Sequence, residues 1–206
     1  MLQRSPEWYA ARCGSLGASE MPDVVRKTKS GVSATRANML AKKLLERLTG
    51  VVAPTYQSKA MLDGIEREAD ARAAYCSMYD VAVETIGLVA HPTIPWTHAS
   101  PDGVGERLVE IKCPEPAEHL RTLLTEKIDR DYLVQMQWQM ACSGRARCDY
   151  VSYNPDFPAA MQLYVQPVDR DEAWIAELEA AARKFLAELD EKLASLVAIY
   201  PLSEAA

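Results

Sequence analysis

Apolar residues recur at helical spacing near both ends of the chain, and this periodicity predicts three helices there. The first ends near Gly50, and its expected apolar positions are Leu40, Leu44, Leu45 and Leu48. The second covers about 59–79, and its expected buried stripe is Leu62, Ile65, Ala69, Ala73 and Cys76. The last begins at Asp169 and Glu172, whose spacing has the form of a capping box. Its apolar positions are Trp174, Leu178, Phe185, Leu189, Leu193 and Leu196.

The middle of the chain changes to runs rich in Val, Ile and Thr, which favour β-strands. Five strands are expected, at about 81–91, 96–100, 107–113, 147–153 and 161–168. A turn rich in Pro and Gly is expected at 101–105, and a further helix at about 131–142. The chain has no internal repeat and no composition break that would mark a linker. We therefore interpret residues 1–206 as a single α/β (α+β) domain with a central mixed sheet flanked by helices.

The composition is that of an ordinary globular protein, but its charge is acidic. Of 206 residues, 49% are hydrophobic and 25% are charged. Lys and Arg number 23 against 29 Asp and Glu, which gives a formal net charge of −6. This balance argues against a generic nucleic-acid binder, which is usually basic. It stays compatible with a local basic stripe on an acidic body, because the local field matters more than the net charge.

Cysteine usage and hydropathy indicate the compartment. The chain has five cysteines, an odd number, with no CxxC pair. This pattern argues against a disulfide framework, a zinc finger and an iron–sulfur cluster. The N-terminus lacks the apolar stretch of a signal peptide, and no run approaches the ~18 apolar residues of a membrane span. We expect reduced thiols, a cytoplasmic location and no membrane partner.

Acidic residues and a lysine gather around the predicted turn and the strand that follows it. Asp102 lies in the turn, and Glu110 and Lys112 alternate along the strand, so their side chains share one face while that of Ile111 points to the other. A hairpin would bring the Asp102 carboxylate beside that of Glu110. Two hard carboxylates suit Mg²⁺ or Mn²⁺, and a nearby lysine can hold a water for phosphodiester hydrolysis. An ordinary surface Glu–Lys pair is the alternative, because the pattern is short.

Two further positions stay open when only spacing is considered. On the helix at 59–79, Glu68 lies beside a partly apolar face, where a carboxylate needs a cation or an arginine partner. Glu66 is a rival ligand on the same helix. In the later helix, Gln135 and Gln137 both could bond a phosphate oxygen or a ligating carboxylate, and a plain polar face is equally compatible.

Several ordered motifs make the chain resemble the phage lambda exonuclease-like recombination nucleases, the YqaJ group of the PD-(D/E)xK superfamily. The motifs run from Trp8 to the last helix, in this order: Trp8, Arg12 and Gly14 with Ala18, Ser19 and Glu20; Gly64, Glu68, Ala71 and Arg72; Ser100, Pro101, Asp102 and Gly103; Glu110, Ile111, Lys112, Cys113 and Pro114; Gln135, Gln137 and Met140. The resemblance implies a restriction-endonuclease-like core.

The resemblance assigns roles that spacing alone leaves open. It implies these metal ligands: Glu68, Asp102, Glu110 and the main-chain carbonyl of Ile111. It implies these catalytic residues: Lys112, Glu110, Asp102 and Gln135. It implies that Arg12 and Ser19 hold a 5′-phosphate, a role that suits a bidentate guanidinium and a hydroxyl donor. Lys59 is a candidate contact with the DNA backbone.

Two basic segments have no clear counterpart in this resemblance. Relatives can carry another phosphate-binding arginine after the motif at Pro114. Here His119 and Arg121 are the nearest candidates, and acids flank them. The loop from Arg26 to Gly31 is basic and is expected either to follow the DNA backbone or to be a solvated loop.

As a member of that group, the chain would be a Mg²⁺-dependent 5′-to-3′ exonuclease on linear double-stranded DNA. It would use two ions, with Mn²⁺ as a substitute, release 5′-mononucleotides and leave 3′ single-stranded tails for recombination. The resemblance also implies a ring-shaped homotrimer and a single-strand annealing protein as partner. The alternatives are a restriction-like or Cas4-like endonuclease or end processor, and a non-catalytic module that binds DNA ends. The missing four-cysteine pattern disfavours the Cas4-like alternative.

Overall fold

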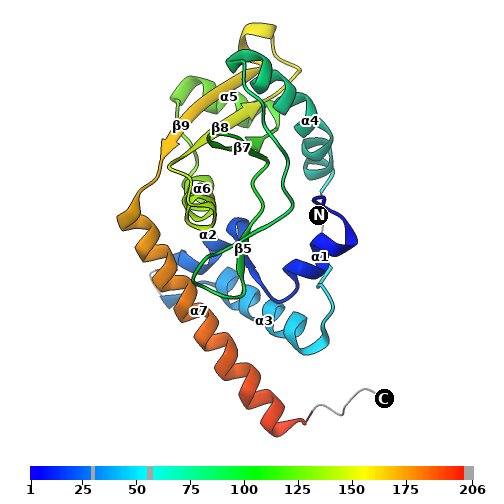
Figure 1. The fold of residues 1–206 in the computed structure, drawn as a ribbon, viewed down its shortest axis with the longest axis vertical. Helices are drawn as coiled ribbons and strands as arrows, with labels where there is room; N and C mark the ends of the chain where they lie inside the picture. Colours follow the sequence, from blue (N-terminus) through cyan, green and yellow to red (C-terminus); the bar gives the residue numbers. More distant parts are fainter. Residues whose placement is uncertain (29–30, 55–57, 202–206) are drawn as a thin grey trace.

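The computed structural model describes residues 1–28, 31–54 and 58–201. Its main sheet is mixed and four-stranded with the order β6-β7-β8-β9, and β7, β8 and β9 lie in the upper half of Figure 1. Its strands are β6 Gly103–Val104, β7 Leu108–Lys112, β8 Arg147–Tyr153 and β9 Leu163–Asp169. The central pair, β7 and β8, is parallel, and both outer strands run antiparallel to their neighbours. The predicted fold class, a mixed sheet flanked by helices, is confirmed.

Helices cover both faces of this sheet, and strand periodicity decides which side chains each helix meets. On one face, Val109 and Ile111 of β7 pack with Ala71 and Tyr75 of α4 (Lys59–Tyr79). On the other face, Leu108 packs with methionines of α6 (Arg130–Ser143). The short helix α5 (Pro116–Thr125) lies against β8. Glu110 lies two residues after Leu108 in the strand, so its side chain is on the same face and points towards α6.

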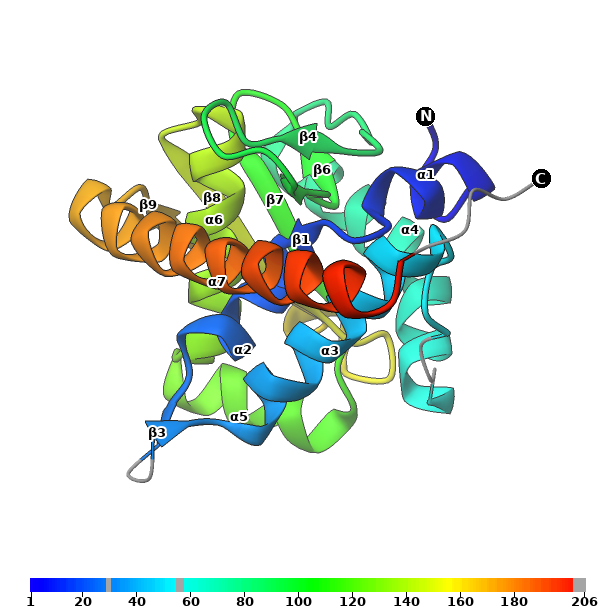
Figure 2. The same ribbon diagram turned by 90° about the horizontal axis from the view of Figure 1, so that it is seen from below.

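The N-terminal segments and the last helix build a second core beside the sheet. The helices here are α1 Pro6–Arg12, η1 Ala18–Glu20, α2 Met21–Val25, α3 Ala34–Thr49 and α7 Glu172–Ile199, and η2 Ala159–Met161 precedes β9. Two small sheets accompany them, β1 Leu16–Gly17 with β5 Thr97–Ala99 and β4 Val89–Ala90, and β2 Lys27–Thr28 with β3 Gly31–Val32. Leu16, Trp138 and Phe185 are fully buried where these elements meet α6. Seen from below, α7 runs across α2 and α3 (Figure 2).

The strand expected at 81–91 is wrong in length. Only β4 and one isolated bridge, from Glu84 to Val104, form there. Val81 is 42% exposed, so this segment lacks the cover that a regular strand needs on at least one face. The turn expected at 101–105 contains the short strand β6, and the sequence patterns did not predict α5.

Two expectations about the helices are corrected. The buried side of α4 carries Ala71 and Tyr75, whereas Leu62 of the expected stripe is 45% exposed. The last helix is capped by Asp171, whose carboxylate accepts the Trp174 N–H at 2.9 Å, and not by Asp169. Asp169 ends β9 and pairs with Arg147 instead. Within the described residues, no helix is both long and apolar enough to cross a membrane.

Candidate active site

One pocket of about 390 Å³ collects the acidic residues and the lysine that the sequence singled out. We call it the carboxylate pocket. α4 supplies Glu68, the turn before β6 supplies Asp102, and β7 supplies Glu110 and Lys112. The remaining lining residues are Arg4, Met61, Gly64, Ile65, Ile111, Cys113, Pro114, Glu115, Tyr132 and Gln135. Segments far apart in sequence meet here because α4, α6 and the turn that carries Asp102 all contact β7.

Glu110 is 1% exposed and is held by hydrogen-bond donors on both carboxylate oxygens. Its Oε1 accepts from Lys112 Nζ at 2.5 Å and from Gln135 Nε2 at 2.7 Å. Its Oε2 accepts from Gln139 Nε2 at 2.5 Å. A buried carboxylate requires such donors, because an unpaired charge in the interior is costly. Gln137 is elsewhere, with its amide bonded to the Asp169 carbonyl and the Asp171 N–H.

Asp102 is fixed by the strand that follows it. Its Oδ2 accepts the Ile111 main-chain N–H at 2.8 Å, a bond that fixes the turn against β7. Burial, and next the negative charge of Glu110, raise the pKa of Asp102 well above its ordinary value. Like charges so close together are destabilising unless a proton or a cation lies between them.

Lys112 is the cation that the structure already places beside these acids, with its ammonium on Glu110. Burial by itself would lower its pKa, but the charges of Glu110 and Asp102 raise that pKa above the ordinary value for lysine. Its ammonium also lies 4.7 Å from the centre of the Tyr132 ring and 3.4 Å from Gln135 Oε1. Lys112 is therefore protonated at neutral pH and held in place on several sides.

Glu68 lines the pocket, whereas its rival Glu66 is exposed. Arginines occupy both of its carboxylate oxygens, since Arg72 donates to Oε1 and Arg4 to Oε2, each at 2.7 Å. Arg72 also donates to the Asp102 carbonyl at 3.0 Å. The arginine partner that sequence reasoning considered for Glu68 is thus present, together with a second one.

The donor set of the pocket fits a hard divalent cation. Glu68, Asp102 and Glu110 offer carboxylate oxygens, which Mg²⁺ prefers. Burial, and next the charge of Glu110, raise the pKa of Asp102, and a bound cation would favour its ionised form. Across residues 1–28, 31–54 and 58–201, no three His, Cys, Asp or Glu side chains are arranged as they would be around a bound metal. Both oxygens of Glu68 accept arginine hydrogen bonds in this arrangement.

A neighbouring pocket of about 200 Å³ has the opposite character. We call it the arginine pocket, and its lining residues are Arg4, Trp8, Tyr9, Arg12, Glu20, Lys42, Lys43, Glu46 and Val52. The Arg12 guanidinium lies 4.1 Å from the centre of the Trp8 ring and donates to Ser100 Oγ at 3.3 Å. Trp8 Nε1 donates to the same hydroxyl at 3.1 Å.

The acids of the arginine pocket already have lysine partners. Glu20 pairs with Lys42 and Lys43, and Glu46 pairs with Lys43. In the described part of the chain, Arg12 therefore keeps its charge without an ion-pair partner. Gly17 permits this crowding, because a Cβ there would lie 3.3 Å from the Arg12 guanidinium. A half-buried cation that no carboxylate neutralises suits an anionic ligand.

The other predicted DNA contacts lie outside these two pockets. Ser19 is exposed on η1, and Lys59 is exposed at the start of α4. His119 is fully buried and bonds to Ser152 and to the Met161 carbonyl, so it is not a phosphate ligand on the surface. Arg121 pairs with Glu118.

The basic loop lies only partly within the described residues. Its residues 29 and 30 fall outside them. At the start of the loop, Arg26 pairs with Asp23 and Asp131.

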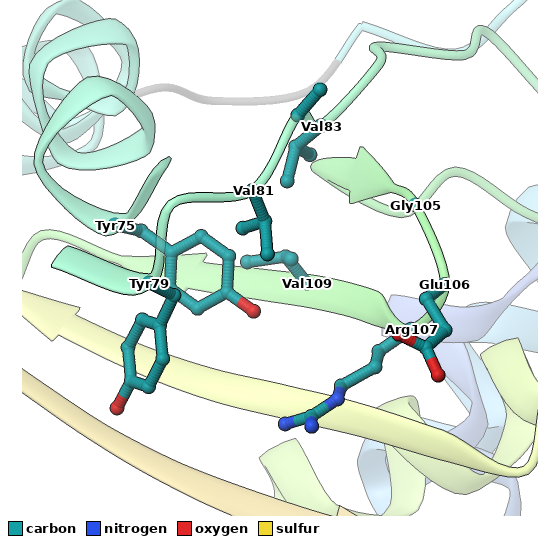
Figure 3. Close-up of a pocket in the computed structure, with 9 residues that line it drawn as sticks. Tyr75, Tyr79, Val81, Val83, Gly105, Glu106, Arg107 and Val109 are labelled. Carbon is teal, nitrogen blue, oxygen red and sulfur yellow. The ribbon is translucent and has the colours of Figure 1, made fainter. Parts of the chain in front are cut away.

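A third pocket, of about 130 Å³, lies at the other end of β7 (Figure 3). Val81, Val83 and Val109 face one another there, with Tyr75 and Tyr79 of α4 on one side and Arg107 on the other. Its lining is mainly apolar, and it lacks the paired carboxylates found at the C-terminal end of the strand. We assign it no role in catalysis.

The residues that sequence reasoning missed include Arg4 and Lys42, which line these pockets, and Ser100 and Gln139, which bond to Arg12 and Glu110. Gln139 had a usable signal, since it follows Gln135 by one helical turn and so shares its side of α6. Ser100 was part of a motif but was not considered as a partner of Arg12. Arg4 and Lys42 had no such signal, because only the tertiary fold brings the N-terminal turn and α3 to the site.

The fold and the carboxylate pocket define the class of the protein. Carboxylates converge at β7 of a mixed sheet, and Lys112 follows Glu110 by two residues. This is the arrangement of the PD-(D/E)xK nucleases. The model of the YqaJ-like viral recombinase domain matches residues 7–146, which is more than half of the chain. The chain belongs to this family.

Solved structures agree with this family assignment. The chain is 42% identical to LHK-Exo in a crystal structure with dAMP, with a TM-score of 0.88, covering 94% of this chain and 96% of that one. Another structure of LHK-Exo, described as an alkaline exonuclease from Laribacter hongkongensis, is 43% identical, with a TM-score of 0.86 and coverage of 93% and 96%.

A phage-related exonuclease from Haemophilus somnus 129PT shares the fold at 13% identity, with a TM-score of 0.66 and coverage of 87% and 96%. The comparison with curated proteins gives no match.

Proposed function

We propose that the protein is a divalent-metal-dependent exonuclease that degrades one strand of linear double-stranded DNA from its 5′ end. The convergence of Glu68, Asp102, Glu110 and Lys112 in one pocket carries this proposal. The family, and the 42% identity to an exonuclease crystallised with dAMP, support a DNA substrate. The neighbouring arginine pocket supports an end-directed reaction, because it offers a site for a terminal phosphate beside the carboxylates.

Glu68, Asp102, Glu110 and the main-chain carbonyl of Ile111 would hold Mg²⁺, with Mn²⁺ as a substitute and with two ions in the complete site. The bound metal would lower the pKa of the attacking water and neutralise charge that develops on the phosphate. Lys112, protonated and held by Glu110, would orient that water and stabilise the developing negative charge. Gln135 would keep Glu110 and Lys112 in register, since its amide contacts both.

Arg12 and Ser19 would bind the 5′-phosphate and so set the direction of degradation, with Lys59 contacting the backbone further along. Hydrolysis would release 5′-mononucleotides and leave a 3′ single-stranded tail for recombination. In the cytoplasm of a bacterial or phage-infected cell, a single-strand annealing protein would coat that tail. A homotrimeric ring around the DNA would keep the enzyme on its substrate between successive cuts.

The decisive experiment replaces the lysine. Lys112→Ala should abolish release of nucleotides from linear duplex DNA in Mg²⁺ while binding to the DNA persists, because the carboxylates remain. Arg147→Ala is a suitable control, since Arg147 pairs with Asp169 at the far end of β8. Full activity of the Lys112→Ala protein would overturn the mechanism.

Covalently closed circular DNA separates the alternatives. An exonuclease leaves it intact, whereas a restriction-like or Cas4-like endonuclease cuts it. If the protein is instead a non-catalytic module that binds DNA ends, the unmodified protein would release no nucleotide from linear or circular DNA.

A further inference from the structure

Arg4 lies at the boundary between the carboxylate pocket and the arginine pocket. Among the described residues, it is the only one that lines both. Its guanidinium donates to Glu68 Oε2 at 2.7 Å, and its side chain is 39% exposed. A cation in this position faces the metal ligands on one side and the proposed phosphate site on the other.

The backbone holds Arg4 at this boundary. The side chain of Gln3 donates to the carbonyls of Ile86 and Pro101, each at 2.9 Å, so the preceding residue is tied to the segment that carries Asp102. The following residue, Ser5, caps α1 by accepting the Trp8 N–H. Arg4 itself has φ 65°, a left-handed conformation at which glycine is the usual residue. Such strain in a non-glycine residue occurs preferentially at functional sites.

Binding of a cation would leave Arg4 without its present partner. Glu68 can ligate a metal only if its oxygens turn away from the arginines, because a metal and a guanidinium compete for the same lone pairs. Arg72 would keep a bond, since it also donates to the Asp102 carbonyl. Arg4 donates to the Glu68 carboxylate only, within the described hydrogen bonds, and would need another anion.

We propose that Arg4 exchanges Glu68 for a phosphate of the bound DNA strand, at the boundary between the two pockets, when the divalent cation binds. This inference rests on the proposed nuclease function and adds a phosphate-binding residue to it. The same guanidinium would neutralise Glu68 in the empty site and grip the substrate in the loaded one. Arg4 would therefore link occupation of the metal site to binding of the DNA end.

The test measures binding of a 5′-phosphorylated duplex by fluorescence anisotropy in Mg²⁺, with Lys112→Ala as the non-cleaving parent. Adding Arg4→Gly, which suits the left-handed backbone, should weaken binding about tenfold. It should also lower the slope of log affinity against log salt by about one. Arg4→Lys should recover part of the loss, because it keeps the charge. Arg147→Ala in the same parent should leave the affinity unchanged.

Mn²⁺ binding without DNA, followed by electron paramagnetic resonance, tests whether Arg4 only supports Glu68. Arg4→Gly should bind Mn²⁺ at least as tightly as the parent, because Glu68 loses a competitor. Weaker Mn²⁺ binding would overturn the exchange. If the parent binds DNA and Arg4→Gly binds it equally well, the role of Arg4 is wrong and the nuclease proposal stands. If the parent binds no DNA in Mg²⁺, both proposals fail.

Discussion

Glu110 shows how a few contacts determine the chemistry of this site. It is almost fully buried, yet three donors satisfy its two oxygens. Two of these donors, Gln135 and Lys112, line the carboxylate pocket, whereas Gln139 lies behind the carboxylate and is fully buried. We therefore expect Gln139 to act through Glu110 and not on the substrate, as a positioning residue.

Replacing Gln139 by leucine should leave Glu110 Oε2 without its donor. An unsatisfied buried acceptor costs about 1–3 kcal/mol, so the free energy of unfolding should fall by about that amount. Glu110 should also lose its fixed orientation, which should lower kcat for nucleotide release. Gln137→Leu is the matched control, because Gln137 contacts the start of α7 and not the site. It should lower the melting temperature and leave kcat nearly unchanged. Equal effects of the two variants on kcat would contradict the role of Gln139.

His98 interacts electrostatically with Arg12 of the arginine pocket and should make stability depend on pH. It is 2% exposed, and its Nδ1 lies 2.8 Å from Ser15 Oγ. Burial, and next the charge of Arg12, lower the pKa of His98 to about 3. In an unfolded chain a histidine titrates near 6.5. Below that pH the unfolded state binds a proton that the folded state does not, so the free energy of unfolding falls until about pH 3.

For His98 this loss amounts to about 2 kcal/mol at pH 5 relative to neutral pH. Urea unfolding at pH 7.5 and pH 5 measures it. The His98→Gln variant lacks the titrating group. From pH 7.5 to pH 5, the free energy of unfolding of this variant should fall about 2 kcal/mol less than that of the unmodified protein. Identical pH dependence in both proteins would show that His98 is protonated in the folded state.

At the scale of elements, β7 connects the fold to the site. Alternation along the strand places Val109 and Ile111 against α4 and Glu110 against α6, so burial of the apolar face orients the acidic one. β7 pairs in parallel with β8 over five residues, from Leu108 to Lys112. This register fixes where Glu110 and Lys112 lie along the sheet. A shift of one residue would exchange the two faces and dismantle the site.

The start of α7 offers a test at the same scale. Asp171 caps this helix, and Asp171→Ala should lower the free energy of unfolding by about 1 kcal/mol, the usual effect of losing an N-cap. Asp169→Ala should have a smaller effect, because its side chain is 75% exposed and its partner Arg147 lies on the surface. Denaturant unfolding of both variants measures the difference. A larger loss for Asp169→Ala would restore the capping box that the sequence suggested.

At the scale of the whole molecule, charge is divided between neighbouring pockets. The carboxylate pocket is lined by four acids and two bases, and the arginine pocket by four bases and two acids. Without a cation, the first pocket would repel a DNA strand that the second attracts. A net charge of −6 is therefore compatible with a DNA substrate, provided that a metal occupies the first pocket.

The proposed ring makes a prediction about size. Sedimentation equilibrium should give a mass three times that of one chain, independent of concentration in the micromolar range. Apolar side chains at the end of α7 are consistent with assembly, since Ile199 is 67% exposed and Tyr200 is 70% exposed. A monomeric mass would contradict the ring. It would not contradict the proposed nuclease activity, which does not require a ring.

The sequence by itself determined the features that depend on local periodicity. Alternation placed Glu110 and Lys112 on one face of a strand. The strand expected at 147–153 is β8, which has the same first and last residues. The mixed α/β architecture followed from the order of helical and strand-like segments. Asp102, Glu110 and Lys112 could be brought together by assuming one hairpin, because only eight residues separate the two acids.

Only the tertiary structure decided which side of each helix is covered. A helical wheel shows which residues share a face, but the sheet decides which face is buried, and so Glu68 and Gln135 enter the pocket while Glu66 and Gln137 do not. The same reason explains the error at Leu62. Arg4, Lys42 and Ser100 come from the N-terminal turn, α3 and the end of β5. Their meeting depends on packing between segments up to a hundred residues apart, which no local pattern encodes.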